Sequence, residues 1–261
     1  MLILYFSGTG NSKYIAELFC RNMNVQDSPG GCHSAECHSI EEKIDFDRLI
    51  TANEVIGFCY PIYGSKVPRI MREFVQKRIE FFKNKKIIIF CTQLIFSGDG
   101  VRVFTDMFPR NFLQVIYAEH FLMPNNVNNL FILPLESDRK IKKYFKKAEQ
   151  KMQVVCNNIK NKKIIKRGFN IFSRILGLPQ GLLMPKIEKK ALDSVKILHD
   201  CTQCGLCISI CPMNNFENQN GKIVTKQNCT ICYRCINKCP EKAIQVFIKA
   251  RVKKQYNCFK Y

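Results

Sequence analysis

The sequence contains the run Cys201-Thr-Gln-Cys204-Gly-Leu-Cys207-Ile-Ser-Ile-Cys211-Pro212 and repeats it 28 residues later as Cys229-Thr-Ile-Cys232-Tyr-Arg-Cys235-Ile-Asn-Lys-Cys239-Pro240. Seven of the 12 positions are identical, including every Cys and the final Pro. The spacing C-x2-C-x2-C-x3-C-P is typical of a tight loop whose first three thiolates bind one [4Fe-4S] cluster while the fourth binds another. The repeat therefore predicts a small module folded around two [4Fe-4S] clusters.

The exchange of the fourth ligand assigns each cysteine to a cluster. We expect one cluster to be bound by Cys201, Cys204, Cys207 and Cys239, and the other by Cys229, Cys232, Cys235 and Cys211. A zinc ribbon uses paired C-x2-C elements and closes with four ligands, which leaves the third Cys and the Pro of each run without a role. A redox dithiol needs only two cysteines. The segment from about residue 197 to 248 resembles the bacterial two-cluster ferredoxins.

The composition indicates where such a protein works. With 261 residues, 46% of them hydrophobic, the chain is long enough for one large core and a small cofactor-bound module. No apolar run is long enough to span a membrane, and Met1 to Phe6 is too short for a signal peptide, so we expect a cytoplasmic protein. The cysteines outside the repeat show no paired spacing and are interpreted as reduced thiols: Cys20, Cys32, Cys37, Cys59, Cys91, Cys156 and Cys258. Exposed clusters of low potential are sensitive to oxygen, and an anaerobic host is our hypothesis.

The formal net charge of +20 is unevenly distributed. Residues 1–135 carry 14 Lys/Arg and 13 Asp/Glu, residues 136–200 carry 17 and 6, and residues 201–261 carry 10 and 2. Four thiolates on each cluster leave about two negative charges per cluster, which offsets only part of the excess. Most of the excess positive charge therefore lies in residues 136–200 and in the cysteine module.

A second signal lies at the N-terminus. The apolar run Met1 to Phe6 precedes Ser7-Gly-Thr-Gly-Asn-Ser12, and Ile15, Leu18 and Phe19 then follow at helical spacing. A strand, a Gly-rich loop and a helix N-terminus together form an anion-binding site. The dinucleotide fingerprint requires a third Gly where this chain has Lys13, and the Walker loop requires a Gly-Lys-Ser/Thr ending that is absent. A plain Gly-rich turn before a capped helix is the alternative.

Further apolar segments alternate with helical ones. We expect strands at 54–60, 86–92 and 114–122, a helix at about 68–78, and a long helix containing Ile141 to Ile159 that is capped by Ser137 or Asp138. This alternation predicts an α/β fold with a doubly wound parallel sheet, which binds ligands at the carboxyl ends of its strands. Loops 7–12, 61–64 and 92–100 meet that condition.

The loop Ser7-Gly-Thr-Gly-Asn-Ser12 resembles the phosphate loop of the flavodoxins, and the other two loops are similar to that family in order and spacing. The resemblance implies a flavodoxin-like fold that binds the phosphate of FMN through Ser7, Gly8, Thr9, Gly10, Asn11 and Ser12. It implies flavin-ring contacts from Pro61, Ile62, Tyr63, Gly64, Thr92, Phe96, Ser97 and Gly98. Tyr63 is the first candidate for stacking on the ring and Phe96 the second; for Tyr63, an ordinary surface aromatic is the alternative.

The whole chain resembles fusions of a flavodoxin-like domain with a C-terminal two-cluster ferredoxin, a class common in clostridia. We assign residues 1–160 to the FMN-binding domain, 161–196 to a basic amphipathic connector, and 197–261 to an α+β ferredoxin domain with a C-terminal tail. The segment Met123-Pro-Asn-Asn126 is also similar to that class and is expected near the flavin. Ordinary flavodoxins and ferredoxins are acidic, so their usual electrostatic partners are not expected for this basic chain.

Two groups of cysteines have competing interpretations. Cys32, His33, Cys37 and His38 occupy the place of a short edge strand. Their C-H-x3-C-H spacing is poor for a metal site, and we expect a polar surface loop there. Cys59 and Cys91 end apolar strands beside the proposed flavin loops. They either tune the flavin or serve as small buried side chains, and we expect the latter.

The connector mixes Lys and Arg clusters with apolar residues at helical spacing, which are Ile164, Ile165, Phe169, Phe172, Ile175 and Leu176. We expect a helix that is broken at Leu178-Pro-Gln-Gly-Leu-Leu-Met-Pro185. Its apolar stripe is expected to pack on the protein itself. Contact with an anionic membrane surface or an acidic partner is the alternative. No nucleic-acid recognition motif accompanies the charge, so no nucleic acid is expected.

Taken together, these features predict an electron-transfer iron-sulfur flavoprotein that passes electrons between two [4Fe-4S] clusters and FMN, and exchanges them with a redox protein or a small molecule. One alternative is an FMN-dependent reductase whose electrons enter through the clusters. Another is a redox-sensing or interaction module that uses the connector. No catalytic residue is assigned, and direct use of NAD(P)H has no support because the dinucleotide fingerprint is absent.

Overall fold

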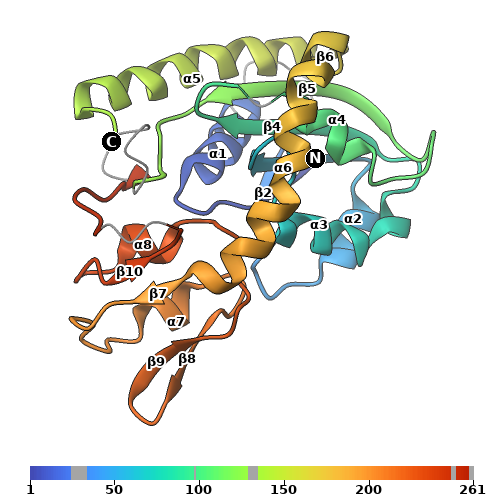
Figure 1. Ribbon diagram of the computed structural model, residues 1–261. Helices are drawn as coiled ribbons and strands as arrows, with labels where there is room; N and C mark the ends of the chain where they lie inside the picture. Colours follow the sequence, from blue (N-terminus) through green and yellow to red (C-terminus); the bar gives the residue numbers. More distant parts are fainter. Residues whose placement is uncertain (25–33, 97, 129–134, 248–250, 259–261) are drawn as a thin grey trace.

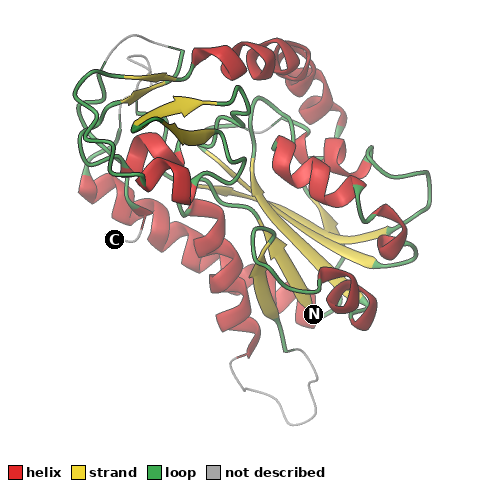
Figure 2. Cartoon of the chain, turned by 90° about the horizontal axis from the view of Figure 1, so that it is seen from below, coloured by secondary structure: helices red, strands yellow, loops and turns green. Residues whose placement is uncertain are grey.

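A computed structural model describes residues 1–24, 34–96, 98–128, 135–247 and 251–258. Its centre is a six-stranded, fully parallel sheet with the order β2-β1-β3-β4-β5-β6 (Figures 1 and 2). The strands are β1 (Leu2–Tyr5), β2 (Glu36–Ser39), β3 (Val55–Pro61), β4 (Lys86–Gln93), β5 (Gln114–Leu122) and β6 (Ile165–Lys166). The order 2-1-3-4-5 is that of the flavodoxin-like doubly wound sheet, whose switch point lies between β1 and β3. The predicted α/β class is confirmed.

Helices cover both faces of the sheet. On one face, α1 (Asn11–Asn24) and α5 (Asp138–Lys160) pack on the strands through Ile15, Phe19 and Met152. The opposite face carries α2 (Phe46–Ala52), α3 (Arg69–Gln76), the 3-10 helix η1 (Ile79–Phe82) and α4 (Gly100–Thr105). Because both faces are covered, β1 and most of β4 are buried, as their continuous apolar sequences predict.

The long helix α5 begins where the sequence predicts. Ser137 is its N-cap, and its Oγ accepts a hydrogen bond from the Lys140 N–H at 3.4 Å. Such a cap satisfies one of the free N–H groups of the first turn. The apolar side chains at helical spacing, including Ile141, Phe145 and Ala148, are buried against the sheet.

The cysteine repeat forms a small separate module. It contains α7 (Leu206–Ile210), α8 (Arg234–Lys238), the antiparallel hairpin β8 (Phe216–Gln219) and β9 (Lys222–Thr225), and the antiparallel pair β7 (Lys196–Ile197) and β10 (Ile244–Gln245). These elements share their own hydrophobic cluster, which includes Phe216, Ile236 and Ile244. Figure 1 shows the module below the carboxyl ends of the sheet strands.

The connector differs from its prediction. Ile165 belongs to the edge strand β6, and the helix α6 (Ile171–Ser194) starts only after the N-cap Asn170, whose Oδ1 accepts from the Ser173 N–H at 2.7 Å. The predicted break is wrong, because α6 continues through Pro179 and Pro185. Both prolines are exposed, and the helix is held from its other side. Proline can disrupt a helix interior, but the tertiary contacts of α6 outweigh this local preference.

Packing of the connector also differs. The expected apolar stripe packs on the protein only in part: Ile165 and Phe169 contact the core clusters of the sheet. By contrast, Phe172 is 73% exposed and Ile175 is 59% exposed. The buried side chains of α6 are Ser173, Met184 and Ala191, together with Gly177. Small residues let the helix axis approach the loops beneath it, and the large aliphatic side chains are left on the outside. Within the described residues, no helix combines the length and the apolar character needed to cross a membrane.

The Cys/His group near residue 35 is likewise different from its prediction. Cys37 and His38 lie in the edge strand β2, which pairs in parallel with β1, and not in a surface loop. Cys32 and His33 lie outside the described residues. The side chain of His38 contacts Glu42 through a hydrogen bond of 2.8 Å from Nδ1. Pairing with β1 satisfies the backbone, which the polar composition of this segment did not suggest.

Candidate cofactor site

A cavity of about 170 Å³ opens at the carboxyl ends of β1, β3 and β4. The three loops expected from the sequence supply Ser7, Gly8, Thr9, Asn11, Ser12, Pro61, Ile62, Tyr63 and Thr92 to its wall. Gln93 and Leu94 extend the wall, and Pro124, Asn125, Asn126 and Val127 close it from the segment after β5. The structure therefore brings the first loop, the Tyr63 turn and the Met123–Asn126 segment together at one site.

The loop between β1 and α1 is held by short hydrogen bonds. The Gly10 N–H donates to Ser7 Oγ at 3.1 Å, and Ser12 Oγ lies 2.8 Å from Thr92 Oγ1. Asn126 Nδ2 donates to Thr9 Oγ1 at 2.7 Å. Because α1 begins at Asn11, its first amides have no acceptor within the helix and carry its partial positive charge. This arrangement suits an anion such as a phosphate group.

Tyr63 is fixed in place at the second loop. Its backbone N–H and C=O pair with those of Lys66 at 3.1 and 3.0 Å. The turn between them places Gly64 and Ser65 in the left-handed region, at φ values of 53° and 60°. The ring lines the cavity and packs on the hydrophobic cluster of the cysteine module. Burial raises the pKa of Tyr63, so the hydroxyl stays protonated.

Several residues expected at the flavin are not part of the cavity wall, and their roles stay predictions. Gly10, Gly64 and Gly98 do not line the cavity, and Phe96 is 41% exposed outside its wall. Ser97 lies outside the described residues. The stacking role expected for Phe96 therefore stays a prediction.

Cys59 and Cys91 are both fully buried and absent from the cavity wall. Cys59 Sγ donates to the Ser12 carbonyl oxygen at 3.2 Å. Burial raises the pKa of the Cys91 thiol to about 12 and that of Cys59 well above its usual range. Both side chains therefore act as small buried groups, as expected, because a thiolate at either position would be poorly solvated.

The cysteines of the repeat surround two further cavities. One cavity is lined by Cys211, Cys229, Cys232 and Cys235. The other is lined by Cys201, Cys204, Cys207 and Cys239, and Cys235 also borders it. This grouping is the one that the exchange of fourth ligands predicts, although the ligand assignment itself stays a prediction. Among the described residues, no three His, Cys, Asp or Glu side chains are placed to hold a single metal ion.

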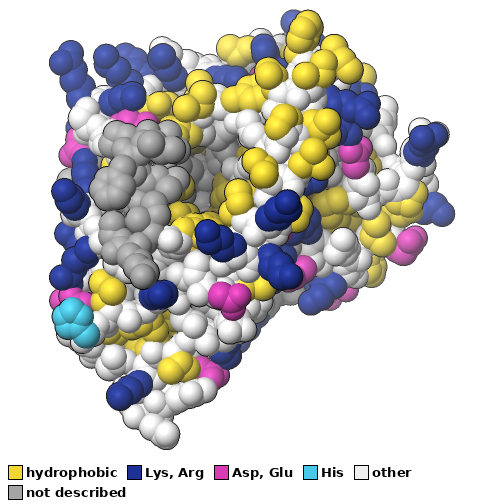
Figure 3. Space-filling model, in the orientation of Figure 1, with side chains coloured by type: hydrophobic (Ala, Val, Ile, Leu, Met, Phe, Trp, Pro, Cys, Tyr) yellow, Lys and Arg dark blue, Asp and Glu magenta, His cyan; other side chains and the backbone are white. Residues whose placement is uncertain are grey.

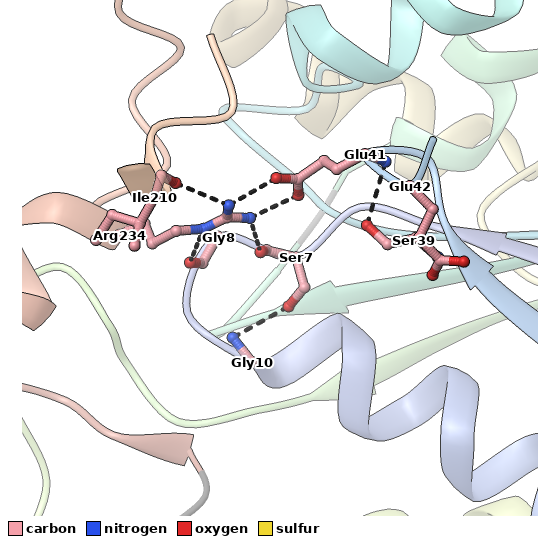
Figure 4. A network of polar contacts seen from close by, with 8 residues as sticks. All are labelled: Ser7, Gly8, Gly10, Ser39, Glu41, Glu42, Ile210 and Arg234. Carbon is pink, nitrogen blue, oxygen red and sulfur yellow. Dashed lines mark hydrogen bonds and ion pairs between the residues drawn. The ribbon is translucent and has the colours of Figure 1, made fainter. Parts of the chain in front are cut away.

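Arg234 joins the second cysteine run to the loop between β1 and α1 (Figure 4). Its guanidinium donates to the carbonyl oxygens of Ser7 at 2.8 Å and Gly8 at 3.1 Å. It also forms a two-pronged ion pair with Glu41, both N–O distances being 2.6 Å, and donates to the Ile210 carbonyl at 3.0 Å. Burial opposes the charge of Arg234, but the hydrogen bonds and charge of Glu41 hold its pKa above the usual value.

The backbones of the cysteine module and of the loop between β1 and α1 also approach each other closely. A Cβ added to Gly8 would collide with the carbonyl oxygen of Cys232 and lie 3.1 Å from its Cβ. Cys232 belongs to the hydrophobic cluster of the neighbouring sheet face. Glycine is therefore required at position 8 by the approach of the cysteine module, whatever ligand the loop binds.

The C-terminal tail completes the contact between the two parts of the chain. Tyr256 Oη donates to Asn11 Oδ1 at 2.6 Å, and the Tyr256 N–H donates to Asn237 Oδ1 at 2.7 Å. Asn237 Nδ2 in turn donates to the carbonyl oxygen of Asn126 at 3.0 Å. One hydrogen-bonded chain thus runs from α8 to both sides of the cavity.

Comparison with known families identifies the two parts. The profile of the flavodoxin domain matches residues 2–152. The chain belongs to the flavodoxin family. The profile of the 4Fe-4S dicluster domain matches residues 200–244, which contain all eight cysteines of the repeat. The two domains together support an electron-transfer protein of the flavin and iron-sulfur type.

Solved structures similar to the flavodoxin part include three bacterial proteins. The two-electron reduced flavodoxin of Megasphaera elsdenii is 18% identical over 58% of this chain and 99% of its own, with a TM-score of 0.39. General stress protein 14 of Treponema denticola, in complex with FMN, is 11% identical over 60% and 97%, with a TM-score of 0.43. Oxidised flavodoxin 1 of Bacillus cereus is 11% identical over 59% and 96%, with a TM-score of 0.37. No curated protein matches the chain.

The residues of the flavodoxin domain fit the cofactor that its family implies. The cavity wall contains two buried polar atoms without a hydrogen-bond partner among the described residues, Tyr63 Oη and Gln93 Oε1. The wall also offers hydroxyl and amide side chains, among them Thr9 and Asn126, which suit a ligand with polar groups. The start of α1 supplies amides for a phosphate, and Tyr63 supplies an aromatic face.

Sequence reasoning missed Arg234 and Tyr256, because their contacts with Gly8 and Asn11 join residues more than 200 positions apart. One signal was present for Arg234. It stands where the first run has Leu206, and a charged side chain that differs between two repeats indicates a contact outside the repeat. Tyr256 lies in the basic tail and gave no signal.

Proposed function

We propose that this chain is an electron carrier in which the cysteine module holds two [4Fe-4S] clusters directly against an FMN site. The proposal is supported by the two family matches and by the packing of Cys232 on Gly8. When bound, the clusters supply one-electron chemistry and FMN supplies one- or two-electron chemistry. The single observation that carries the proposal is this backbone contact, because it brings the second cysteine run against the loop that we propose binds the phosphate.

The residues proposed to hold FMN come from three loops. Backbone and side-chain groups of Ser7 to Ser12 would bind the phosphate, and Pro61 to Tyr63 with Thr92 would contact the ring. We add Asn125 and Asn126, which line the same cavity and position Thr9. Arg234 donates hydrogen bonds to the backbone carbonyls of Ser7 and Gly8, so its role is to position this loop.

The two sets of cysteines differ in how far they are exposed to solvent. Cys232 is buried against the flavodoxin domain, whereas Cys204 is exposed. Cys235 borders both cysteine cavities, so the two sets are neighbours. We propose that an external redox partner approaches the Cys204 side and that the Cys232 side serves the internal contact.

The test begins with an anaerobic preparation of the full chain. We expect about eight irons and eight sulfides, as two cubane clusters require, with FMN bound in a one-to-one ratio. Zinc in place of iron would contradict the cluster assignment, and riboflavin binding as tightly as FMN would contradict the phosphate site. Steady turnover of a small-molecule acceptor, faster than exchange with redox proteins, would support a reductase in place of a carrier.

A further inference from the structure

The outer face of α6 carries a row of large apolar side chains, all aliphatic except Phe172, which we call the aliphatic row. Its side chains are between 41% and 73% exposed and belong to Ile171, Phe172, Ile175, Leu176, Leu178, Leu182, Leu183 and Ile187. Their spacing places them along one side of the helix over Ile171 to Ile187, about 24 Å at 1.5 Å per residue. Figure 3 shows hydrophobic side chains gathered along α6 on this face of the molecule. A surface band of this extent usually marks a contact with another phase or molecule.

The inner face of α6 cannot rotate to bury this row. Ser65 Oγ donates to Gln180 Oε1 at 3.1 Å, and a Cβ on Gly98 would lie 2.6 Å from the Cα of Gly177. A Cβ on Gly64 would lie 3.0 Å from Met184 Sδ. Contacts to two loops beside the cofactor cavity therefore fix the orientation of the helix and keep the aliphatic row outside.

The charge around the row is mostly positive. From residue 161 to 192 the chain has eight basic residues, all exposed: Lys162, Lys163, Lys166, Arg167, Arg174, Lys186, Lys189 and Lys190. The acidic residues of α6 are Glu188, whose carboxylate is paired with Arg72 at 2.8 Å, and Asp193, which is exposed near the end of the helix. The aliphatic row is thus flanked at both ends by positive charge.

We propose that α6 docks on the surface of an anionic lipid bilayer, with its aliphatic row in the interface and its basic residues at the head groups. A helix with one apolar side and flanking Lys and Arg binds membranes in this way. A second copy of the chain fits poorly, because both surfaces carry the same charge and the net charge is +20. A protein groove is also disfavoured, since protein interfaces concentrate binding in Trp, Tyr and Arg, whereas this row is mainly Leu and Ile.

The test measures binding of the purified holoprotein to vesicles by flotation. Vesicles of equal parts phosphatidylcholine and phosphatidylglycerol should bind the chain, pure phosphatidylcholine should bind it far less, and added salt should release it. Ile175→Asn combined with Leu182→Asn should weaken binding by about tenfold or more. The matched control is Ile44→Asn with Phe81→Asn, two exposed apolar residues outside α6, which should bind like the native chain.

The charge is tested by Lys186→Glu, Lys189→Glu and Lys190→Glu together, against Lys142→Glu, Lys143→Glu and Lys146→Glu on α5 as the control with the same charge change. Only the α6 set should abolish the preference for anionic vesicles. Unchanged iron and flavin contents show that each variant is folded, and they keep this test separate from that of the proposed function. The proposal is overturned if the native chain ignores anionic vesicles, if both apolar pairs bind equally, or if Ile175→Asn with Leu182→Asn instead abolishes a dimer in solution.

Discussion

The two cysteine runs have the same ligands but different surroundings. In the first run, Gly205 has open space around it, and Leu206 is 37% exposed. In the second run, Tyr233 is buried, and the Arg234 side chain is only 19% exposed because it contacts the flavodoxin domain. Both Gly205 and Tyr233 adopt a left-handed backbone before a short helix, with φ values of 76° and 57°.

This difference shows which residues perform which task. The ligand spacing fixes the local loop, because thiolates must converge on the cluster in both runs. The two residues between the second and third Cys do not affect that spacing and are free to diverge. In the second run they join the module to the loop beside the cofactor cavity, and in the first they face outward.

The largest expected effect comes from removing a ligand. Cys232→Ala should lose one cluster, destabilise the module and weaken FMN binding, because Cys232 lines the second cysteine cavity and also meets Gly8 of the phosphate loop. Cys204→Ala should lose one cluster but leave FMN affinity near the native value, since Cys204 is exposed. Anaerobic iron counts and FMN titration measure both. Equal loss of FMN in the two variants would remove the distinction between the runs.

The second-largest effect is expected from exchanging Arg234 and Leu206, which occupy the same position in the two runs. Arg234→Leu leaves Glu41 and the carbonyls of Ser7 and Gly8 without their donor, and should lower the free energy of unfolding by about 2 to 4 kcal/mol. The reverse change in the first run, Leu206→Arg, should alter it by less than about 0.5 kcal/mol at an exposed site. Denaturant unfolding of the holoprotein measures both. Similar values for the pair would show that the Arg234 contact contributes little.

Alanine substitutions at Gly8 and Gly205 distinguish the cost of a steric contact from the cost of backbone strain. Gly8→Ala should cost about 2 to 3 kcal/mol and weaken FMN, because the new methyl group would displace the backbone of Cys232. Gly205→Ala has space for its methyl group and should cost only about 1 kcal/mol from the left-handed backbone. Thermal unfolding and FMN titration distinguish them. Native FMN affinity in Gly8→Ala would mean that the module does not position the loop.

The smallest effect tests the loop itself. Thr9→Ala removes the acceptor of Asn126 Nδ2 and one hydroxyl of the cavity wall, and should weaken FMN by about 1 to 2 kcal/mol. Thr202→Ala in the exposed part of the first run is the control and should leave FMN affinity unchanged. Fluorescence quenching of FMN gives both affinities. If Thr9→Ala binds FMN normally while Gly8→Ala does not, the loop acts through its backbone only.

The central part of the fold was predictable because its signals are local. Runs such as Lys86-Ile-Ile-Ile-Phe-Cys-Thr92 indicate buried strands whatever surrounds them, and Ser137 before an amphipathic segment indicates a helix start. The short strands β2 and β6 were missed, since polar or basic residues form them only by pairing with the strand beside them.

By itself, the sequence determined the two cysteine loops, the Gly-rich loop and the order of the main strands. Each of these depends on residue spacing within about a dozen positions, where chain geometry leaves few alternatives. Only the tertiary structure decided that Cys232 meets Gly8, that Arg234 reaches Ser7, and that α6 continues through two prolines with its large side chains outside. These outcomes depend on residues far apart in the chain. Their contacts are set by the packing of whole surfaces, which no local pattern contains.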